Sequence, residues 1–550
     1  MGTLDWVVIG IFFLALIGII VWVVKQKQND SADYFLGGRD ATWLAIGASI
    51  FASNIGSEHL IGLAGAGASS GMAMAHWEIQ GWMILILGWV FVPFYSRSMV
   101  YTMPEFLERR YNPQSRTILS VISLISYVLT KVAVTVYAGG LVFQQVFGIK
   151  ELWGIDFFWI AAIGLVVLTA LYTIFGGMKS VLYTSVLQTP ILLLGSLIIL
   201  VLGFKELGGW DEMMSICSAV TVNEYGDTMT QLIRDNNDPN FPWLGALVGS
   251  AIIGFWYWCT DQFIVQRVLS GKNEKEARRG TIFGAYLKLL PVFLFLIPGM
   301  IAFALHQKYI GAGGEGFLPL LANGTANADA AFPTLVAKLL PAGVKGLVVC
   351  GILAALMSSL ASLFNSSAML FTIDFYKRFK PETPEKKLVG IGQIATVVIV
   401  ILGILWIPIM RSVGDVLYTY LQDVQSVLAP GIAAAFLLGI CWKRTSAKGG
   451  MWGLIAGMII GLTRLGAKVY YSNTAITDSS MFKYLFYDLN WLFFCGWMFL
   501  FCIIVVIAVS LMTEAPSAEK IQGLVFGTST PEQKAATRAS WNHWDIIHTV

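Results

Sequence analysis

Residues 52–62, ASNIGSEHLIG, place several polar side chains inside a segment that is otherwise apolar enough to cross a membrane. A polar group at bilayer depth is costly unless it has a partner or faces a water-filled cavity. Gly56 weakens the helix at this point, and an unwound turn exposes backbone carbonyls, which are tolerated only against protein or a cavity. The stretch therefore predicts a broken helix that lines a solute or ion site.

Close helix packing is the alternative explanation, because small residues let membrane helices approach one another. Packing accounts for the glycines from Gly62 to Gly71, but it does not account for Asn54 and His59. The position of Glu58 stays open, since its carboxylate would also suit an outer vestibule filled with water.

The composition of the whole chain is that of a helical membrane protein. Of its 550 residues, 56% are hydrophobic and 13% are charged, whereas a soluble domain has about 25% charged residues. A span needs about 20 apolar residues, so we predict an all-α polytopic membrane protein with about 13 to 14 transmembrane helices. The predicted spans are 5–24, 42–68, 74–96, 117–147, 154–175, 181–203, 243–268, 281–306, 340–373, 388–410, 415–440, 446–466 and 487–512.

The basic residues predict an orientation. With the N-terminus outside, the lysines and arginines gather in the inner loops, as the positive-inside rule requires. The long loops 205–240 and 307–339 then lie outside. The last residues, SWNHWDIIHTV (540–550), look like the approach to one more span, so we expect a copy truncated before a last helix.

Motifs for nucleotide or metal chemistry are absent from the sequence. No GxGxxG unit, Walker loop, HExxH or paired CxxC motif stands in a suitable context, and these are the motifs that would carry such chemistry. We therefore expect neither an enzyme nor an ATP-driven pump.

Two further stretches carry polar groups into predicted spans. In HWEIQGW (76–82), Glu78 is either an interfacial carboxylate at a helix start, favoured by the helix dipole, or an acceptor for solute hydroxyls. In WYWCTDQFIVQR (256–267), the aromatic residues suit the apolar face of a ring. Asp261 and Arg267 in the same stretch are expected to form an ion pair near the inner face.

Two lysines lie within predicted spans. Lys288 either snorkels to the inner surface, pairs with Glu78 or donates to a solute. Lys131 has the same ambiguity, and the sequence indicates no partner for it.

Hydroxyl groups recur along LMSSLASLFNSS (356–367). Ser358, Ser362 and Asn365 lie on one helical face. Serines often bond to their own helix, but uncharged hydroxyls and freed carbonyls are also oxygen ligands that suit an alkali cation, without the fixed charge that calcium requires.

Taken together, these stretches resemble the sodium/glucose cotransporters of the sodium:solute symporter family over nearly the whole chain. The resemblance is carried by DYFLGGRDATWLAIGASIFASNIGSEHLIGLAG (33–65), YTMPEFLERRY (101–111), WYWCTDQFIVQRVLSGKN (256–273), AYLKLLPVF (285–293), LMSSLASLFNSSAMLFTIDFY (356–376) and YLQDVQSVLAPGIAAAFLLGICWKR (420–444).

The resemblance implies a LeuT-type core, a 5+5 inverted repeat with flanking helices. The implied parts are a first span and inner loop (1–41), a first repeat of five helices (42–203), an extracellular loop (204–242), a second repeat of five helices (243–440) and C-terminal spans with a tail (441–550).

The resemblance also implies roles for single residues. Sugar hydroxyls would bond to Asn54, His59, Glu78, Lys288 and Gln422, beside the aromatic pair Tyr257 and Trp258. Tyr257 would form an inner gate, with Trp77 and Tyr418 at an outer gate. Sodium would be held by the carbonyls of Ala52, Ile55 and Ala355 and the hydroxyls of Ser358 and Ser359.

The activity implied is sodium-coupled symport of a hexose, such as glucose or galactose, by alternating access. Three positions depart from the family pattern: Gly254 lacks a polar side chain, Ser185 replaces an aspartate, and Ala361 replaces a hydroxyl of a second sodium site. The last two departures favour one sodium per sugar. A symporter of another polyol-like solute, such as myo-inositol, and a sugar-gated sensor or channel remain alternatives.

The expected partners are therefore a small sugar, the sodium ion and the lipid bilayer, with no nucleic acid and no obligatory protein partner. The outer loops lack the several cysteines of the animal relatives. This difference suggests a bacterial source and a place in the inner, plasma membrane.

Overall fold

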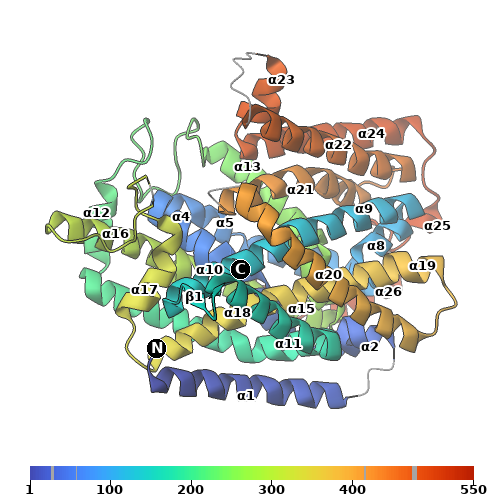
Figure 1. The fold of residues 1–550 in the computed structure, drawn as a ribbon. Coiled ribbons are helices and arrows are strands. Elements are labelled where there is room, and N and C mark those ends of the chain that lie inside the picture. The colour runs from blue at the N-terminus through green and yellow to red at the C-terminus, as the bar shows by residue number, and fades with distance from the viewer. Residues whose placement is uncertain (27–29, 57, 322, 414–416, 473–479) are drawn as a thin grey trace.

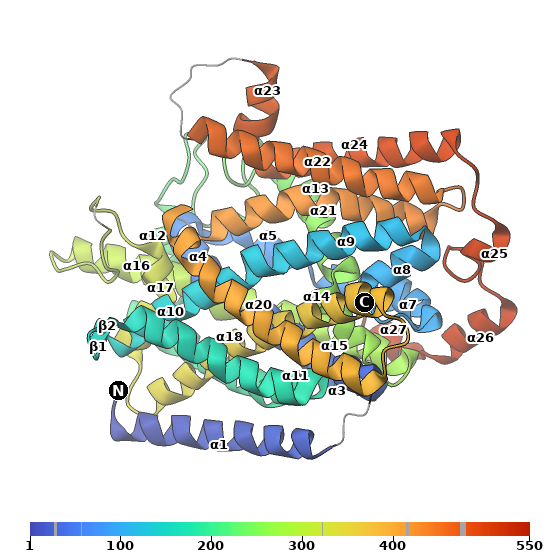
Figure 2. The same ribbon diagram turned by 45° about the vertical axis from the view of Figure 1, so that its right-hand side comes forward.

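The protein is a bundle of long helices that lie side by side (Figure 1). The computed structural model describes residues 1–550 apart from 27–29, 57, 322, 414–416 and 473–479, and within helices it does not describe the side chains of 129–130, 409–413, 417–423 and 472. In Figures 1 and 2, α1, α11, α22 and α24 run in similar directions across the molecule.

The helices of the first half begin with a peripheral helix and continue through several interrupted rods. They are α1 (Thr3–Lys25), α2 (Ser31–Leu36), α3 (Trp43–Asn54), α4 (Ala64–Ser70), α5 (Ala75–Glu78), α6 (Gly81–Ile86), α7 (Val92–Ser98), α8 (Met103–Arg110), α9 (Pro113–Ser126), α10 (Ala133–Phe147), α11 (Phe157–Leu207) and α12 (Trp210–Ser218). A short hairpin, β1 (Glu151–Leu152) and β2 (Ile155–Asp156), precedes α11.

The second half continues the bundle. Its helices are α13 (Trp243–Gly254), α14 (Gln262–Leu269), α15 (Glu274–Lys288), α16 (Ile297–Gly311), α17 (Ala331–Leu339), α18 (Val344–Met369), α19 (Lys377–Phe379), α20 (Glu385–Val413), α21 (Leu417–Cys441), α22 (Ala447–Ser472), α23 (Met481–Lys483), α24 (Trp491–Met512), α25 (Ala518–Ile521), α26 (Pro531–Ala539) and α27 (His543–Ile547).

Wider π-helical turns interrupt several of these rods. They are η2 (Glu58–Leu63), η4 (Leu87–Phe91), η5 (Tyr127–Val132), η6 (Phe255–Thr260), η7 (Val292–Leu296), η9 (Leu370–Tyr376) and η10 (Tyr484–Asp488). Short 3₁₀ turns are η1 (Gly37–Arg39), η3 (Gly71–Met74) and η8 (Ala328–Ala330). Such π turns occur frequently at functional sites.

Ten helices, or runs of consecutive helices, among the described residues are long and apolar enough to cross a membrane. These helices differ in how deeply they are buried. In the most apolar part of Val344–Phe379, 89% of the residues are buried, whereas in that of Thr3–Lys25 only 22% are buried. A helix that is apolar and buried all round lies in the core, so α18 is central, whereas α1 exposes apolar side chains at the surface of the bundle.

Each predicted span overlaps a helix or a run of helices, with one unexpected connection. The predicted span 181–203 and most of the predicted span 154–175 lie within α11, which is interrupted at Gly177. Gly177 has a φ of 53°, and a β-carbon there would lie 2.4 Å from the carbonyl oxygen of Tyr34. Only glycine fits both the backbone conformation and the space.

The predicted break in ASNIGSEHLIG is present. α3 ends at Asn54, Ile55 is extended with φ −77° and ψ 111°, and η2 begins at Glu58. A β-carbon on Gly56 would lie 3.1 Å from Ser359 Oγ, so glycine lets the break approach α18. A second break, which we did not predict, follows η6, where Asp261 is extended and caps α14.

The N-terminus lies at the same end of the bundle as the long loops. Asp5 accepts hydrogen bonds from the backbone of Gly343 at 2.6 Å and Gly346 at 2.8 Å, and α12 and α17 lie at this end (Figure 1). At the opposite end, the tail folds back on the bundle, with Arg279 Nε 2.8 Å from Asp545 Oδ1. This arrangement agrees with a common side for the N-terminus and the loops 205–240 and 307–339.

Candidate solute and sodium sites

A small polar cavity lies where the break after α3 meets α5, η6 and α15. Its volume is about 30 Å³, which holds roughly two water molecules, since one needs about 10 to 15 Å³ of such space. A solute the size of a monosaccharide therefore enters only when lining side chains move apart. The lining residues are Asn54, Glu58, His59, Trp77, Glu78, Gln80, Ile253, Gly254, Tyr257, Trp258, Lys288 and Gln425.

Four of the predicted solute ligands form one network in this cavity. Lys288 Nζ donates to Glu78 Oε2 at 2.6 Å and to Asn54 Oδ1 at 3.1 Å. Asn54 Nδ2 donates to the hydroxyl of Tyr257 at 3.1 Å. All four side chains are buried, and buried charges require partners of this kind.

The network decides between the alternatives that the sequence left open. Lys288 does not snorkel to the surface, because it is 3% exposed and pairs with Glu78. Glu78 is not an interfacial carboxylate, because it is 2% exposed. Glu58 is half-buried and lines the cavity, and its role stays open.

His59 lies beside the same carboxylate. Its Nε2 is 3.3 Å from Glu78 Oε2, but neither ring nitrogen makes a well-aligned hydrogen bond within the described part of the chain. A buried imidazole in this position has donor and acceptor capacity left for a solute hydroxyl.

Aromatic rings border the network. The rings of Tyr257 and Trp258 meet edge to face at 4.9 Å, and Lys288 Nζ lies 5.4 Å from the centroid of Trp258. Trp77 contacts Trp491 at 5.7 Å between centroids. Aromatic faces of this kind suit the C–H face of a saturated ring, while the Tyr257 hydroxyl offers a polar contact.

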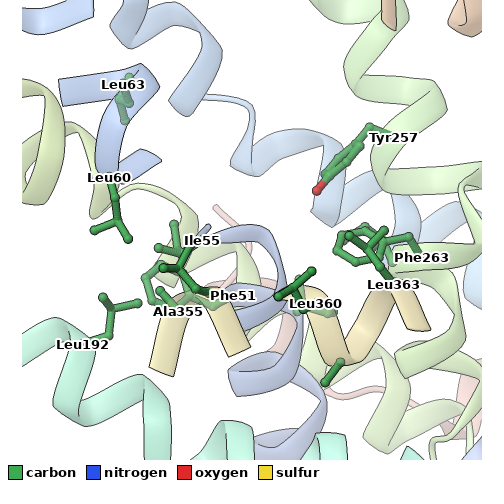
Figure 3. Close-up of a cluster of buried hydrophobic side chains, with 14 of the residues drawn as sticks. Phe51, Ile55, Leu60, Leu63, Leu192, Tyr257, Phe263, Ala355, Leu360 and Leu363 are labelled. Carbon is green, nitrogen blue, oxygen red and sulfur yellow. The ribbon is translucent and has the colours of Figure 1, made fainter. Parts of the chain in front are cut away.

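Three of the five predicted sodium ligands, Ile55, Ala355 and Ser359, lie where the end of α3 meets α18. Figure 3 shows Ile55, at the end of α3, next to Ala355 of α18. No described residue donates a hydrogen bond to the carbonyl of Ala52 or Ile55. Ser359 is buried close to Gly56, and its hydroxyl makes no hydrogen bond with the described residues. Free carbonyls and a hydroxyl at one point are oxygen ligands for a cation.

Ser185 and Ser358 lie next to this point. Ser185 Oγ lies 3.2 Å from Ser358 Oγ and donates to the carbonyl of Val181 at 2.6 Å. Position 185, one of the departures expected from the resemblance, is therefore beside the predicted sodium ligand Ser358, and it carries no charge.

Two predicted site residues lie outside the described side chains, namely Gln422 and Tyr418. The cavity also includes residues that the sequence did not indicate, above all Gln80 and Gln425. Gln80 follows Glu78 by two positions in HWEIQGW, so its polarity inside a span was the signal available.

The expected pair of Asp261 with Arg267 is wrong. Asp261 Oδ2 accepts from Lys131 Nζ at 2.7 Å, and Asp261 Oδ1 accepts from the hydroxyl of Tyr127. Arg267 Nε donates to Ser53 Oγ at 3.2 Å. The break after η6 turns Asp261 toward η5, whereas Arg267 lies two turns further along α14, facing α3.

Comparisons with known proteins agree with this geometry. The sequence profile of the sodium:solute symporter family matches residues 34–457. The chain is 37% identical to human sodium/myo-inositol cotransporter 2 over 538 residues, which cover 95% of this chain and 79% of that protein. It is 37% identical to sodium/glucose cotransporter 1 of Ovis aries over 529 residues, which cover 93% and 79%.

Among solved structures, a Na⁺-coupled sialic acid symporter in a substrate-bound outward-open state shares the fold. The TM-score is 0.76 at 23% sequence identity, over 94% of this chain and 99% of that chain. This likeness confirms the predicted all-α, LeuT-type architecture.

The relatives and the fold make the protein a transporter and not an enzyme. It is a multi-pass membrane protein and a sodium-coupled solute symporter, with Na⁺ as the co-transported ion. The chain belongs to the sodium:solute symporter family.

Proposed function

We propose that the solute is a hexose, such as glucose or galactose, moved into the cell together with sodium by alternating access. The observation that carries this proposal is the buried network of Glu78, Lys288 and Asn54 beside the rings of Tyr257 and Trp258. A carboxylate accepts from hydroxyls, an ammonium donates to them, and an amide does both. Aromatic rings next to these groups match the apolar face of a sugar ring.

Myo-inositol is the second candidate, because the relatives include sodium/myo-inositol cotransporters at 37% identity. It has the same ring size and a hydroxyl on every ring carbon, so the same network would accept it. The hexose has a ring oxygen, which only accepts hydrogen bonds, where myo-inositol has one more hydroxyl-bearing carbon.

Sodium would order the solute site through the backbone. The carbonyls of Ala52 and Ile55 flank Asn54 in the sequence, so a cation that holds them against Ser358 and Ser359 also fixes Asn54 at the cavity. Sugar binding would then favour closure at Trp77 and Tyr418, and loss of sodium inside would release the sugar past Tyr257.

One sodium per sugar suffices energetically. Moving one charge through 100 mV is worth about 2.3 kcal/mol, and a tenfold sodium gradient adds about 1.4 kcal/mol. The sum of about 3.7 kcal/mol supports accumulation of roughly several hundred-fold. Positions 185 and 361 support this ratio, because Ala361 offers no oxygen ligand and Ser185 offers an uncharged hydroxyl where the resemblance implies a carboxylate.

The same proposal places the N-terminus outside and the protein in a bacterial inner membrane. The orientation rests on the basic inner loops, and the source rests on the few cysteines in the outer loops.

The proposed function predicts sodium-dependent uptake in proteoliposomes. Labelled glucose or galactose is expected to enter with one charge per sugar, measured as current against tracer flux. Competition by myo-inositol without competition by either hexose would move the assignment to the polyol. Sodium-dependent current without net sugar uptake would instead indicate a sensor or channel.

A Ser359→Ala variant is expected to raise the sodium concentration needed for half-maximal uptake by about tenfold, because it removes one oxygen ligand worth about 1 to 1.5 kcal/mol. The order of preference among sugars should stay the same. Uptake is measured against sodium concentration at fixed sugar.

Ser270→Ala is the matched control. Ser270 is also buried, at the C-terminal end of α14, and its hydroxyl donates to the carbonyl of Gln266 at 2.8 Å, away from the proposed ligands. Equal sodium dependence in both variants would remove Ser359 from the sodium site.

A further inference from the structure

Gly254 leaves a gap in the polar lining of the cavity. A β-carbon at this position would lie 2.6 Å from Gln80 Oε1, 3.0 Å from Gln80 Cδ and 3.3 Å from Met83 Cγ. A real β-carbon does not approach another atom so closely. The space that a side chain at position 254 would need is therefore taken by the carboxamide of Gln80.

The carboxamide of Gln80 is held in one orientation. Gln80 is 4% exposed, and its Nε2 donates to the carbonyl of Ser250 at 3.0 Å. Because the NH₂ group must face that carbonyl, Oε1 points the other way, over Gly254. Gln80 lines the cavity, and its Oε1 makes no hydrogen bond with any residue that the structure describes.

We propose that Gln80 is a solute-binding residue that determines specificity, and that its Oε1 accepts a hydrogen bond from one hydroxyl of the transported ring. Gln80 reaches across the cavity from the loop after α5 and supplies the polar atom that Gly254 on α13 does not have. This inference rests on the proposed function, since it assigns a hydroxyl-bearing solute to the same cavity.

The chemistry of the oxygen gives a specific selectivity. Oε1 accepts hydrogen bonds and cannot donate them, whereas Lys288 donates and cannot accept. A hydroxyl facing Gln80 must therefore act as donor. Replacing that hydroxyl by hydrogen or by fluorine removes the donor in both cases, while fluorine in place of a hydroxyl that faces Lys288 keeps a weak acceptor.

The test uses a panel of monodeoxy and monodeoxyfluoro derivatives of the transported sugar as competitors of sodium-dependent uptake. The wild-type protein is expected to bind both derivatives of one ring position about three- to tenfold more weakly than the parent sugar, the range of one neutral hydrogen bond. The Gln80→Ala variant should bind the parent sugar more weakly by the same factor. It should no longer distinguish the parent sugar from the two derivatives at that ring position.

Gln393→Ala is the matched control. Gln393 Nε2 also donates to a backbone carbonyl, that of Ile174, at 3.1 Å, but Gln393 does not line the cavity. The relative affinities of this variant for the deoxy and deoxyfluoro sugars should equal those of the wild type. An unchanged profile in Gln80→Ala overturns the proposal.

Gly254 gives a second, independent variant. Gly254→Ala is expected to displace the Gln80 carboxamide, because the far end of a flexible side chain yields more easily than backbone. It should therefore lose the same discrimination as Gln80→Ala, and the double variant should show no further loss. Gly254→Ser in the Gln80→Ala background should restore a polar contact and part of the affinity. Additive losses in the double variant overturn the proposal.

Uptake by the wild-type protein tests the proposed function before any variant is compared. If the wild-type protein shows no sodium-dependent uptake of any sugar or polyol, the function itself is wrong. If the wild type transports sugar but the Gln80 and Gly254 variants keep its profile, only the role of Gln80 is wrong.

Discussion

Replacing Asp261 with asparagine is expected to lower the free energy of unfolding by about 3 to 5 kcal/mol, because removal of one partner leaves a buried charge without compensation. Lys131 and Asp261 are each 4% exposed, and Lys131 Nζ and Asp261 Oδ2 are 2.7 Å apart. The apparent melting temperature of the purified protein should fall by several degrees or more, as measured by thermal unfolding in detergent.

Transport should be lost as well. Lys131 Nζ lies 4.6 Å from the centroid of Tyr257 and 4.7 Å from that of Phe263, so the pair supports the ring of the proposed inner gate. The rings of Tyr257 and Phe263 lie 6.3 Å apart between centroids, and Figure 3 shows both, away from Ile55 and Ala355. An uncompensated ammonium beneath Tyr257 would change the position of that ring.

Two further variants separate this effect from a general one. Asp40→Asn is the surface control, because Asp40 and Lys272 are 4.0 Å apart and both side chains are more than 60% exposed, where a pair is worth at most about 1 kcal/mol. Lys131→Met combined with Asp261→Asn removes both charges and should regain most of the stability. A double variant less stable than Asp261→Asn would contradict the assignment of the pair.

The sequence allowed the break after α3 to be predicted because a helix in lipid cannot hide polar groups. Asn54 and His59 are too costly in a span unless they face a cavity, and Gly56 marks where the chain can turn. The same reasoning placed Glu78 and Lys288 among functional candidates, but it could not show that they pair, because 210 residues separate them.

Features that depend on how distant helices meet were not predictable from single segments. The partner of Lys131 is 130 residues away, and only the break after η6 turns Asp261 toward it. The Gln80 carboxamide fills a gap that exists only because Gly254 lies opposite. Such pairs follow from tertiary packing, whereas periodicity and local polarity report single elements.

The family resemblance supplied what the residues alone did not. It joined α3 and α18 as the two sides of a sodium site, although serines on a helix are explained equally well by bonds to their own backbone. The structure brings Ile55, Ala355 and Ser359 into one region, which makes the Ser359→Ala measurement the direct test of that transfer.

A Glu78→Gln variant is expected to raise the half-saturating sugar concentration by about ten- to a hundredfold, because hydrogen bonds to a charged group are worth about 1.5 to 3 kcal/mol. It is also expected to destabilise the protein by about 3 to 5 kcal/mol, since Lys288 stays buried without its counter-charge. Uptake kinetics and thermal unfolding measure the two effects separately.

The double variant Glu78→Gln with Lys288→Met distinguishes the structural part from the functional part. It removes both buried charges, so stability should return toward that of the wild type, while uptake stays low because two solute ligands are gone. Glu212→Gln is the matched control, since Glu212 and Lys308 lie 3.6 Å apart with side chains more than 40% exposed. Recovery of transport together with stability would show that the pair only holds the helices together, and the network around Asn54 would then have to be assigned to packing instead of sugar recognition.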